Sequence, residues 1–380
     1  MNETSFTSKV SGSVRFDPDG MYPYFQPNTL PFNIDFDRGI RRRSLDAIIA
    51  LSNLNGMISG MEPEEKGVLL SALTLKESVH SSSIEGTRST ISDMLLSEKE
   101  ELDGALGRDV KEVNNYREAL LCGTREIEDG GRITVGLIHK LHRMLLEGTR
   151  GSNKSPGEFK TEQNAIGMPG DTLETAKMVP APPESVEYLI DNLLEYMDSD
   201  ENPLIKIALI HYQFEAIHPY RDGNGRIGRL LVMLLLEKEG ILTFPAIYPS
   251  EYFDRHRDEY IDSLFGVSSE DRFEEWVGFF IGAMRIQTEY SLRMIRSLGA
   301  YRKQLESDCA SMKEMQLIGM LFVNPYLRIK DVASKCSVSL PTASKMVSKL
   351  VASGVLRETT DRRRNRLFVA DGVLEILTMR

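Results

Sequence analysis

The stretch 218–236 constrains the fold of this 380-residue chain more than any other. A polar loop at 218–229, with the sequence His-Pro-Tyr-Arg-Asp-Gly-Asn-Gly-Arg-Ile-Gly-Arg, runs directly into seven consecutive apolar residues at 230–236. A helix that is apolar on every side is buried on every side, so this segment is predicted to be the central helix of a domain. Gly223 and Gly225 allow the loop before it to turn tightly and to approach a ligand closely.

The junction between this loop and the helix is a predicted anion site. Free backbone N–H groups and the positive end of the helix dipole favour an anion there. Arg226 and Arg229 lie three residues apart on one face of the first turn, where both can grip phosphate oxygens. Asp222 offers a hard carboxylate suited to Mg²⁺ that carries phosphates. His218 titrates near neutrality, which makes it the natural general base.

The string 218–229 resembles the signature of the Fic family, His-Pro-Phe-x-Asp/Glu-Gly-Asn-Gly-Arg-x-x-Arg, and only Tyr220 departs from it. That residue is a Phe in the family and anchors the loop; Tyr serves equally if its hydroxyl finds a partner. The resemblance covers about residues 20–300. It implies a protein adenylyltransferase, a nucleotidyltransferase that moves AMP from ATP to a Ser, Thr or Tyr hydroxyl of a target protein and releases pyrophosphate.

The resemblance also implies a role for each residue of the site. His218 takes the proton from the target hydroxyl, and Asp222 holds Mg²⁺. The ATP-binding set comprises Gly223, Asn224, Gly225, Arg226 and Arg229, with the two arginines on the β- and γ-phosphates. Tyr252 belongs to an aromatic segment at 248–260 that is suited to flank a purine, although core packing explains that segment equally well.

A second family pattern lies near the end of a helix predicted over 66–83. Gly86 is suited to a left-handed helix stop, which places Glu85 at the helix C-terminus, where a negative charge opposes the dipole. A residue that breaks a local rule hints at function. Ser81, Glu85 and Gly86 match the inhibitory-helix pattern of Fic proteins, Ser/Thr-x-x-x-Glu-Gly/Asn, in which the Glu pairs with the second motif arginine, here Arg229. We therefore expect autoinhibition.

Residues 148–183 break helical periodicity, and we predict a short β-hairpin around the turn at 167–170. In Fic proteins a hairpin flap at this place lines the site and holds the target segment by strand-like pairing. The residues that resemble that flap are Phe159, Lys160, Gln163, Asn164 and Ile166, with Lys160 where many relatives have Arg. An ordinary surface hairpin would read the same way.

Apolar residues at helical spacing predict further helices over 45–54, 109–120, 135–146, 184–197, 203–217 and 274–307. The fold class is therefore a mainly α Fic helical core with a small β-hairpin flap. We expect three regions: an N-terminal arm with the inhibitory helix at 1–100, a catalytic core at 101–308 and a winged-helix domain at 311–380. The arm before residue 40 is expected to be extended over the surface or partly loose. His139 and His142 are expected to be core or surface histidines.

Residues 311–380 carry twelve basic and six acidic side chains, a net charge of +6, whereas the whole chain carries −10 and the first 310 residues therefore −16. Three helices followed by two strands is the order of a winged helix-turn-helix. Its exposed recognition face would present Thr342, Ser344, Lys345 and Lys349, and its wing Arg362, Arg363, Arg364 and Arg366. Binding to DNA phosphates and a purely protein-contact role are equally open.

Three scattered cysteines argue against a disulfide framework and fit a reducing cytoplasm, and neither a signal peptide nor a membrane-spanning run is expected. ATP and a target protein are the expected partners, and a homodimer stays open. A Fic-like phosphotransferase is one alternative, but those relatives carry Ala and Lys where this chain has Gly223 and Arg226. A transcription regulator that only senses nucleotide is the other, and the intact His218 argues against it.

Overall fold

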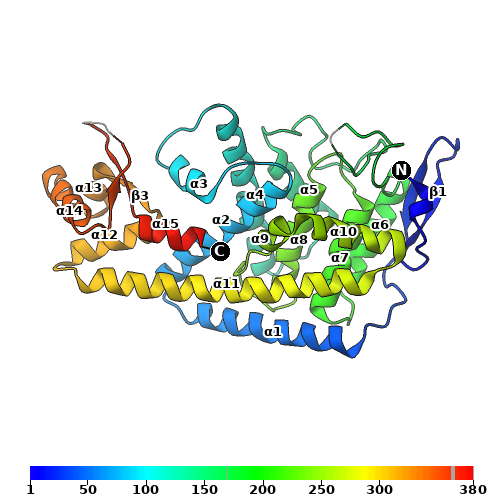
Figure 1. Ribbon diagram of the computed structural model, residues 1–380, viewed down its shortest axis with the longest axis horizontal. Helices are drawn as coiled ribbons and strands as arrows, with labels where there is room; N and C mark the ends of the chain where they lie inside the picture. The colour runs from blue at the N-terminus through cyan, green and yellow to red at the C-terminus, as the bar shows by residue number, and fades with distance from the viewer. Residues whose placement is uncertain (169, 361–363, 380) are drawn as a thin grey trace.

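The computed structural model describes residues 1–168, 170–360 and 364–379, and most of them are helical, which confirms the predicted fold class. A long helix, α11 (Phe273–Ser307), runs along one side of the helical core and links it to the C-terminal elements, and α1 (Arg38–Ser59) packs against it (Figure 1). The two small sheets lie at opposite ends of this elongated arrangement. The large helical core lies between them.

The predicted central helix is α8 (Asn224–Lys238), and it is buried on all sides from Arg226 to Glu237. Four helices surround it: α2 (Pro63–Ile84), α4 (Gly104–Glu128), α5 (Val135–Leu146) and α7 (Pro203–Ile217). The start of α8 carries the motif arginines, and these four helices enclose the helix. Charged side chains there are held by their neighbours and not by solvent.

Local capping fixes where several helices begin. The Thr134 side chain accepts the Leu137 N–H to start α5, and Asn202 starts α7 with Pro203 at its first position. The predicted bounds 135–146 and 203–217 are therefore confirmed. The predicted helices at 45–54 and 109–120 are longer in the structure, as α1 and α4. Helix α1 already starts after Asp37, whose carboxylate accepts the Ile40 N–H. The helices predicted at 184–197 and 274–307 are α6 (Pro183–Tyr196) and α11.

The N-terminal arm is extended over the core, one of the two expectations for it, whereas the predicted flap hairpin is reduced. The N-terminal arm is an ordered antiparallel hairpin of β1 (Gly12–Phe16) and β2 (Pro23–Pro27), held to the core where Phe25 N–H donates to the Val179 carbonyl at 2.8 Å. The expected hairpin at 167–170 is reduced to one antiparallel bridge, in which Ile166 and Met178 exchange N–H···O bonds of 2.8 and 3.0 Å. The residues between them form a loop, and Pro169 of the predicted turn lies outside the described residues.

Several elements were not predicted. They are the 3-10 helix η1 (Glu3–Ser5), α3 (Ile91–Ser97), α9 (Ser250–Arg255), α10 (Arg257–Glu270), β3 (Tyr326–Arg328) and α15 (Asp371–Thr378). Most are too short for a periodic pattern to stand out, whereas the 14-residue α10 lies in a segment that was read only for its aromatic residues. Within the described part of the chain no helix is both long enough and apolar enough to cross a membrane.

The C-terminal elements comprise α12 (Met312–Val323), β3, α13 (Ile329–Lys335), α14 (Leu340–Ala352), β4 (Arg357–Glu358), β5 (Leu367–Val369) and α15. The strands pair antiparallel in the order β3-β5-β4. This unit is docked on α2: buried Lys76 of α2 donates to the Leu377 and Met379 carbonyls at 3.4 and 3.2 Å, at the end of α15. Ser92 of α3 also bonds the Tyr326 hydroxyl at 2.7 Å.

Candidate active site

The loop that follows α7 is held in shape by two asparagines. His218 ends α7 in the left-handed region (φ 50°, ψ 60°), an uncommon conformation for a residue with a side chain. The Asn164 amide donates to the carbonyls of His218 and Tyr220 at 3.1 and 2.8 Å. Asn224 accepts the Tyr220 N–H and donates to the Tyr220 carbonyl, at 2.8 and 2.7 Å. The Asn224 side chain thus closes the loop, in addition to the phosphate contact predicted for it.

Tyr220 is the anchor that its position in the motif predicted. Its buried hydroxyl bonds His139 Nδ1 at 2.9 Å, and its ring stacks on His142 at a centroid distance of 3.8 Å. His142 Nδ1 accepts the Gly157 N–H at 2.8 Å, so Nε2 carries the proton and donates to the Asp222 carbonyl at 2.9 Å. Burial lowers the pKa of His142 to about 4, which keeps the ring neutral. Both histidines of α5 therefore support the loop, a role that the sequence analysis missed.

Arg229 is clamped by the end of α2. Its Nη2 donates to Glu85 Oε1 at 2.7 Å and to the Ser81 carbonyl at 2.8 Å, and its Nε donates to the Ser81 hydroxyl at 3.0 Å. The helix stops at Gly86 (φ 97°), and the Gly86 and Thr87 N–H groups bond the Ser83 and Ser82 carbonyls, as in a Schellman motif. The structure therefore brings Ser81, Glu85 and Arg229 together.

The electrostatics of this pair favour the charged forms. Burial would raise the pKa of Glu85, but the Arg229 guanidinium outweighs it and holds that pKa below its ordinary value. The approach is close enough to need a glycine at 225: a Cβ added there would lie 2.3 Å from Glu85 Oε1. Gly223, at φ 79°, meets the other demand on the loop, a left-handed turn just before α8.

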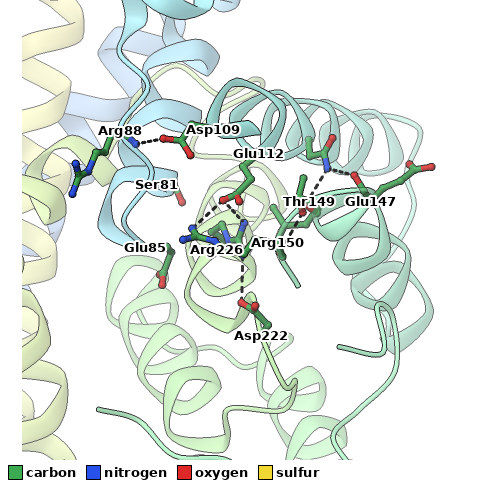
Figure 2. Close-up of polar contacts among 12 residues, drawn as sticks. Ser81, Glu85, Arg88, Asp109, Glu112, Glu147, Thr149, Arg150, Asp222 and Arg226 are labelled. Atoms are coloured by element: carbon green, nitrogen blue, oxygen red, sulfur yellow. Dashed lines mark hydrogen bonds and ion pairs between the residues drawn. The ribbon is translucent and has the colours of Figure 1, made fainter. Parts of the chain in front are cut away.

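Arg226 lies three residues before Arg229 on the same face of α8, but its partners differ. Its Nη2 is 3.5 Å from Asp222 Oδ1, and its Nη1 is 3.7 Å from Glu112 Oε2 (Figure 2). The Asp222 side chain is 38% exposed, whereas that of Arg226 is only 4% exposed. Asp222 and Arg226 thus form a charged pair at the start of α8.

The sequence expectation that His218 titrates near neutrality is wrong, since its pKa is lowered to about 3. Burial, together with the nearby Lys160 ammonium, lowers its pKa and keeps the imidazole neutral at pH 7. The side chain stays 21% exposed, so a reacting hydroxyl can reach it. Its Nδ1 is 3.8 Å from a carboxylate oxygen of Glu215.

Three of the residues predicted to form the flap brace the loop. Buried Lys160 donates to the Ile217 carbonyl at 3.2 Å and to Asn164 Oδ1 at 2.7 Å, and burial lowers its pKa to about 7. The Phe159 ring packs on Tyr220 at 5.6 Å. Gln163 donates to the Pro180 carbonyl at 2.9 Å, and Ile166 makes the bridge to Met178. Phe159, Lys160 and Asn164 therefore contact the loop, whereas Gln163 and Ile166 pair with residues 178–180.

Two other predicted sets are placed as follows. Tyr252 of α9 stacks on His256 at 4.3 Å and contacts Phe279 at 5.4 Å. On α14, Thr342, Lys345 and Lys349 are exposed and Ser344 is partly buried, but Lys349 is paired with Glu314 at 2.8 Å. Arg366 is paired with Glu358. Arg362 and Arg363 lie outside the described residues, and Arg364 is exposed.

Comparisons with known proteins agree with this geometry. Residues 42–125 match the model of the Fic/DOC family N-terminal region, 132–236 that of the Fic/DOC family, and 300–372 that of the "Protein adenylyltransferase SoFic-like, C-terminal domain". The chain belongs to the Fic/DOC family. The middle match contains His218, the whole Fic loop and nearly all of α8, and the first contains Ser81 and Glu85.

The Fic relatives are distant. A "Protein adenylyltransferase fic-1" from Caenorhabditis briggsae is 30% identical over 139 residues, which is 35% of this chain and 24% of that protein. A "Protein adenylyltransferase Fic" from Aedes aegypti is 26% identical over 258 residues, 64% of this chain and 45% of that protein. The chain thus spans from about a quarter to under half of the length of these curated relatives.

A solved structure shares the fold. A Fic family protein from Desulfovibrio desulfuricans G20 superposes with a TM-score of 0.56 at 18% identity, over 89% of this chain and 97% of that one. The similarity extends over nearly the whole length of both chains, so it concerns the overall arrangement of helices as well as the Fic core.

Proposed function

We propose that this chain is a protein adenylyltransferase that transfers AMP from ATP to a hydroxyl of a target protein. The observation that carries the proposal is the arrangement at the start of α8. A neutral, partly exposed His218 lies in the same loop as Asp222, and the loop leads into a helix N-terminus with two buried arginines. The names of the relatives point to the same reaction.

The reaction follows from these groups. His218 accepts the proton of the target Ser, Thr or Tyr hydroxyl, whose oxygen then forms a bond to the α-phosphorus of ATP. The bond from that phosphorus to the oxygen bridging to the β-phosphate breaks, and pyrophosphate leaves. The N–H groups at the start of α8 and the guanidinium of Arg226 would bind the leaving phosphates. Phosphoryl chemistry of this kind depends mainly on positioning and on charge stabilisation.

Asp222 is the residue that would hold Mg²⁺. The ion neutralises phosphate charge when it is bound, and sites of this class use one or two carboxylates together with the phosphates of the substrate. The half-exposed carboxylate of Asp222 beside Arg226 fits that requirement. Across the described residues no three His, Cys, Asp or Glu side chains gather as a metal site, so substrate phosphates would supply further ligands.

We also propose that the resting enzyme is autoinhibited by Glu85. Three hydrogen bonds from Arg229 to Ser81 and Glu85 occupy that arginine before ATP arrives. An arginine held in this way cannot reach the γ-phosphate, and a misplacement of about one ångström can lower a rate by about a hundredfold.

The C-terminal elements form, in our proposal, a winged helix whose main contact is within this chain. The bonds from Lys76 to the end of α15 and from Ser92 to Tyr326 support this. With Lys349 and Arg366 already paired with acids, a DNA duplex would depend on Lys345 and on the wing tip. Three unpaired cysteines accord with a cytoplasmic location.

The test compares Glu85→Gly with Glu85→Gly/His218→Ala. Both variants lack the inhibitory carboxylate, so the effect of His218 on the rate of AMP transfer can be measured. With α-labelled ATP, Mg²⁺ and a cell lysate, loss of the base is expected to lower protein labelling by about 10²- to 10⁴-fold. Binding of ATP, measured by calorimetry, should persist in both. Equal labelling by the two variants, or labelling from γ-labelled ATP in place of α-labelled ATP, would contradict the proposal.

A further inference from the structure

Glu112, on α4, is a buried carboxylate shared by two arginines from different elements. Its Oε2 is 3.3 Å from Nη2 of Arg150, in the loop after α5, and 3.7 Å from Nη1 of Arg226 at the start of α8. Figure 2 shows Glu112 with one dashed contact to each arginine, and Asp222 on the far side of Arg226. The Glu112 carboxylate thus lies between two guanidinium groups, and Asp222 supplies a second carboxylate on the other side of Arg226.

Arg226 lacks acceptors that a buried arginine ordinarily has. The side chain is only 4% exposed, yet its Nε and Nη1 have no hydrogen-bond partner among the described residues. Buried donors are nearly always satisfied, and an arginine carries five of them. The 3.7 Å between Arg226 Nη1 and Glu112 Oε2 is longer than a hydrogen bond. The carboxylate therefore balances the charge of Arg226 but does not accept a hydrogen bond from these donors. An anionic ligand beside Arg226 would accept hydrogen bonds from these unsatisfied Nε and Nη1 donors.

The loop that carries Arg150 is fixed against the same edge. The Asn115 amide donates to the Leu145 and Glu147 carbonyls at 3.2 and 2.9 Å, which holds the end of α5 and the start of the loop. Gly151 packs on Asp222 so closely that a Cβ at this position would lie 2.6 Å from Oδ2. The Arg150 side chain itself is 64% exposed, so its guanidinium can turn toward a ligand at low cost.

We propose that Arg150 is a third phosphate-binding arginine of this site, which contacts the part of ATP that leaves as pyrophosphate. Glu112 is then a positioning residue that holds Arg150 and Arg226 side by side. The inference rests on the proposed function, because it takes ATP as the ligand. It adds a contact from outside the signature loop. It also explains why a buried carboxylate, which by itself would repel phosphates, lies near this site: Glu112 holds the two arginines in place. Charge-assisted contacts to phosphate are those for which arginine is best suited.

Calorimetry in the Glu85→Gly background tests this, with ATP, inorganic pyrophosphate and AMP as probes, each with Mg²⁺. Arg150→Ala is expected to weaken ATP and pyrophosphate binding by about tenfold, the effect of losing one charge-assisted hydrogen bond, and to leave AMP binding unchanged. Lys154→Ala, an exposed cation a few residues further along, is the matched control and should leave all three affinities as they are. Unchanged pyrophosphate affinity in Arg150→Ala, or an equal loss in the control, overturns the phosphate contact.

The role of Glu112 needs a second readout, because the substitution of a buried acid also affects stability. In a double-mutant cycle, Arg150→Ala should reduce pyrophosphate affinity less when Glu112→Gln is already present, since Arg150 has then lost its support. Equal losses in the two backgrounds would show that Glu112 does not act through Arg150. A protein that binds pyrophosphate through Arg150 but transfers no AMP would contradict the proposed function and leave this inference standing.

Discussion

Arg229 and Arg226 lie three residues apart on one face of α8, and both are almost fully buried, at 2% and 4% exposure. Their surroundings differ. Arg229 makes three hydrogen bonds, all to the last turns of α2, whereas Arg226 keeps two donors without acceptors and has carboxylates at 3.5 and 3.7 Å. One side of the anion site is therefore closed by a neighbouring helix, and the other is open to a ligand.

Glu85, which pairs with Arg229, and Glu112, which lies near Arg226, differ in how far they are buried. Glu85 is 38% exposed and comes from a helix end, so it can return to water when a phosphate competes for Arg229. Glu112 is buried in the middle of α4, where an uncompensated charge would be very costly. Glu85 is thus suited to reversible inhibition, and Glu112 to permanent support.

Removal of Glu85 should have the largest effect on this comparison. We expect Glu85→Gly to raise self-labelling from α-labelled ATP by about a hundredfold, since Arg229 becomes free to align the phosphates. The added Arg229→Ala substitution should abolish the gain. Glu128→Gly, which removes an exposed acid at the end of α4, is the control for helix-end effects and should leave labelling at the parent rate. Parent-like labelling by Glu85→Gly would remove the inhibitory role.

Substitution of Glu112 should act in the opposite direction. In the Glu85→Gly background, Glu112→Gln is expected to lower AMP transfer by about tenfold, because Arg226 and Arg150 lose their shared support. The rate is measured at saturating ATP, with circular dichroism to confirm that the variant is folded. A rise in rate would mean that Glu112 restrains the site as Glu85 does, and the contrast between the two carboxylates would fail.

Ser81 offers a finer test of the closed side. Its hydroxyl accepts one of the three hydrogen bonds from Arg229, while its carbonyl accepts another that survives any substitution. Ser81→Ala should therefore raise labelling only about threefold to tenfold, well below the effect of Glu85→Gly. Ser83→Ala, two residues along the same helix turn, is the control. An increase as large as that of Glu85→Gly would shift the main inhibitory contact from the carboxylate to the hydroxyl.

The closed side of the site could be predicted from the sequence and the open side only in part. The family pattern pointed to Ser81, Glu85 and Arg229, and seven apolar residues pointed to the buried α8. Glu112 was missed because its helix was read only for apolar residues. It lies four residues before Tyr116, on the stripe that faces the core, and a charge on that stripe was the available signal.

Other misses have a similar origin. His142 follows Ile138 by four residues on the buried face of α5, but nothing in that spacing says which loop it supports. Arg150 stands in a glycine-containing loop whose path depends on long-range contacts such as Gly151 on Asp222. The flap failed as a hairpin because its residues are satisfied by the loop at 217–220 and by the Pro180 carbonyl, and no pattern of alternating residues records such partners.

The smallest expected effect is the pH dependence of the Glu85 clamp. Because the folded-state pKa of Glu85 lies below its ordinary value, the clamp contributes stability above that ordinary value and loses it as the pH falls through the lowered one. The parent should therefore melt slightly higher than Glu85→Gln at every pH from 5 to 8, by roughly one or two degrees, since the carboxylate is partly exposed. The two melting curves should approach each other only as the pH falls below the ordinary carboxyl value, and they should converge below the lowered pKa of Glu85, where the parent carboxyl is protonated as well. Differential scanning fluorimetry over this range measures the gap, and Glu128→Gln controls for the loss of an exposed acid. A gap that does not narrow at all as the pH falls below the ordinary carboxyl value would show that the clamp does not depend on an ionised Glu85. Competition between phosphate and a charged Glu85 would then not explain the release of Arg229.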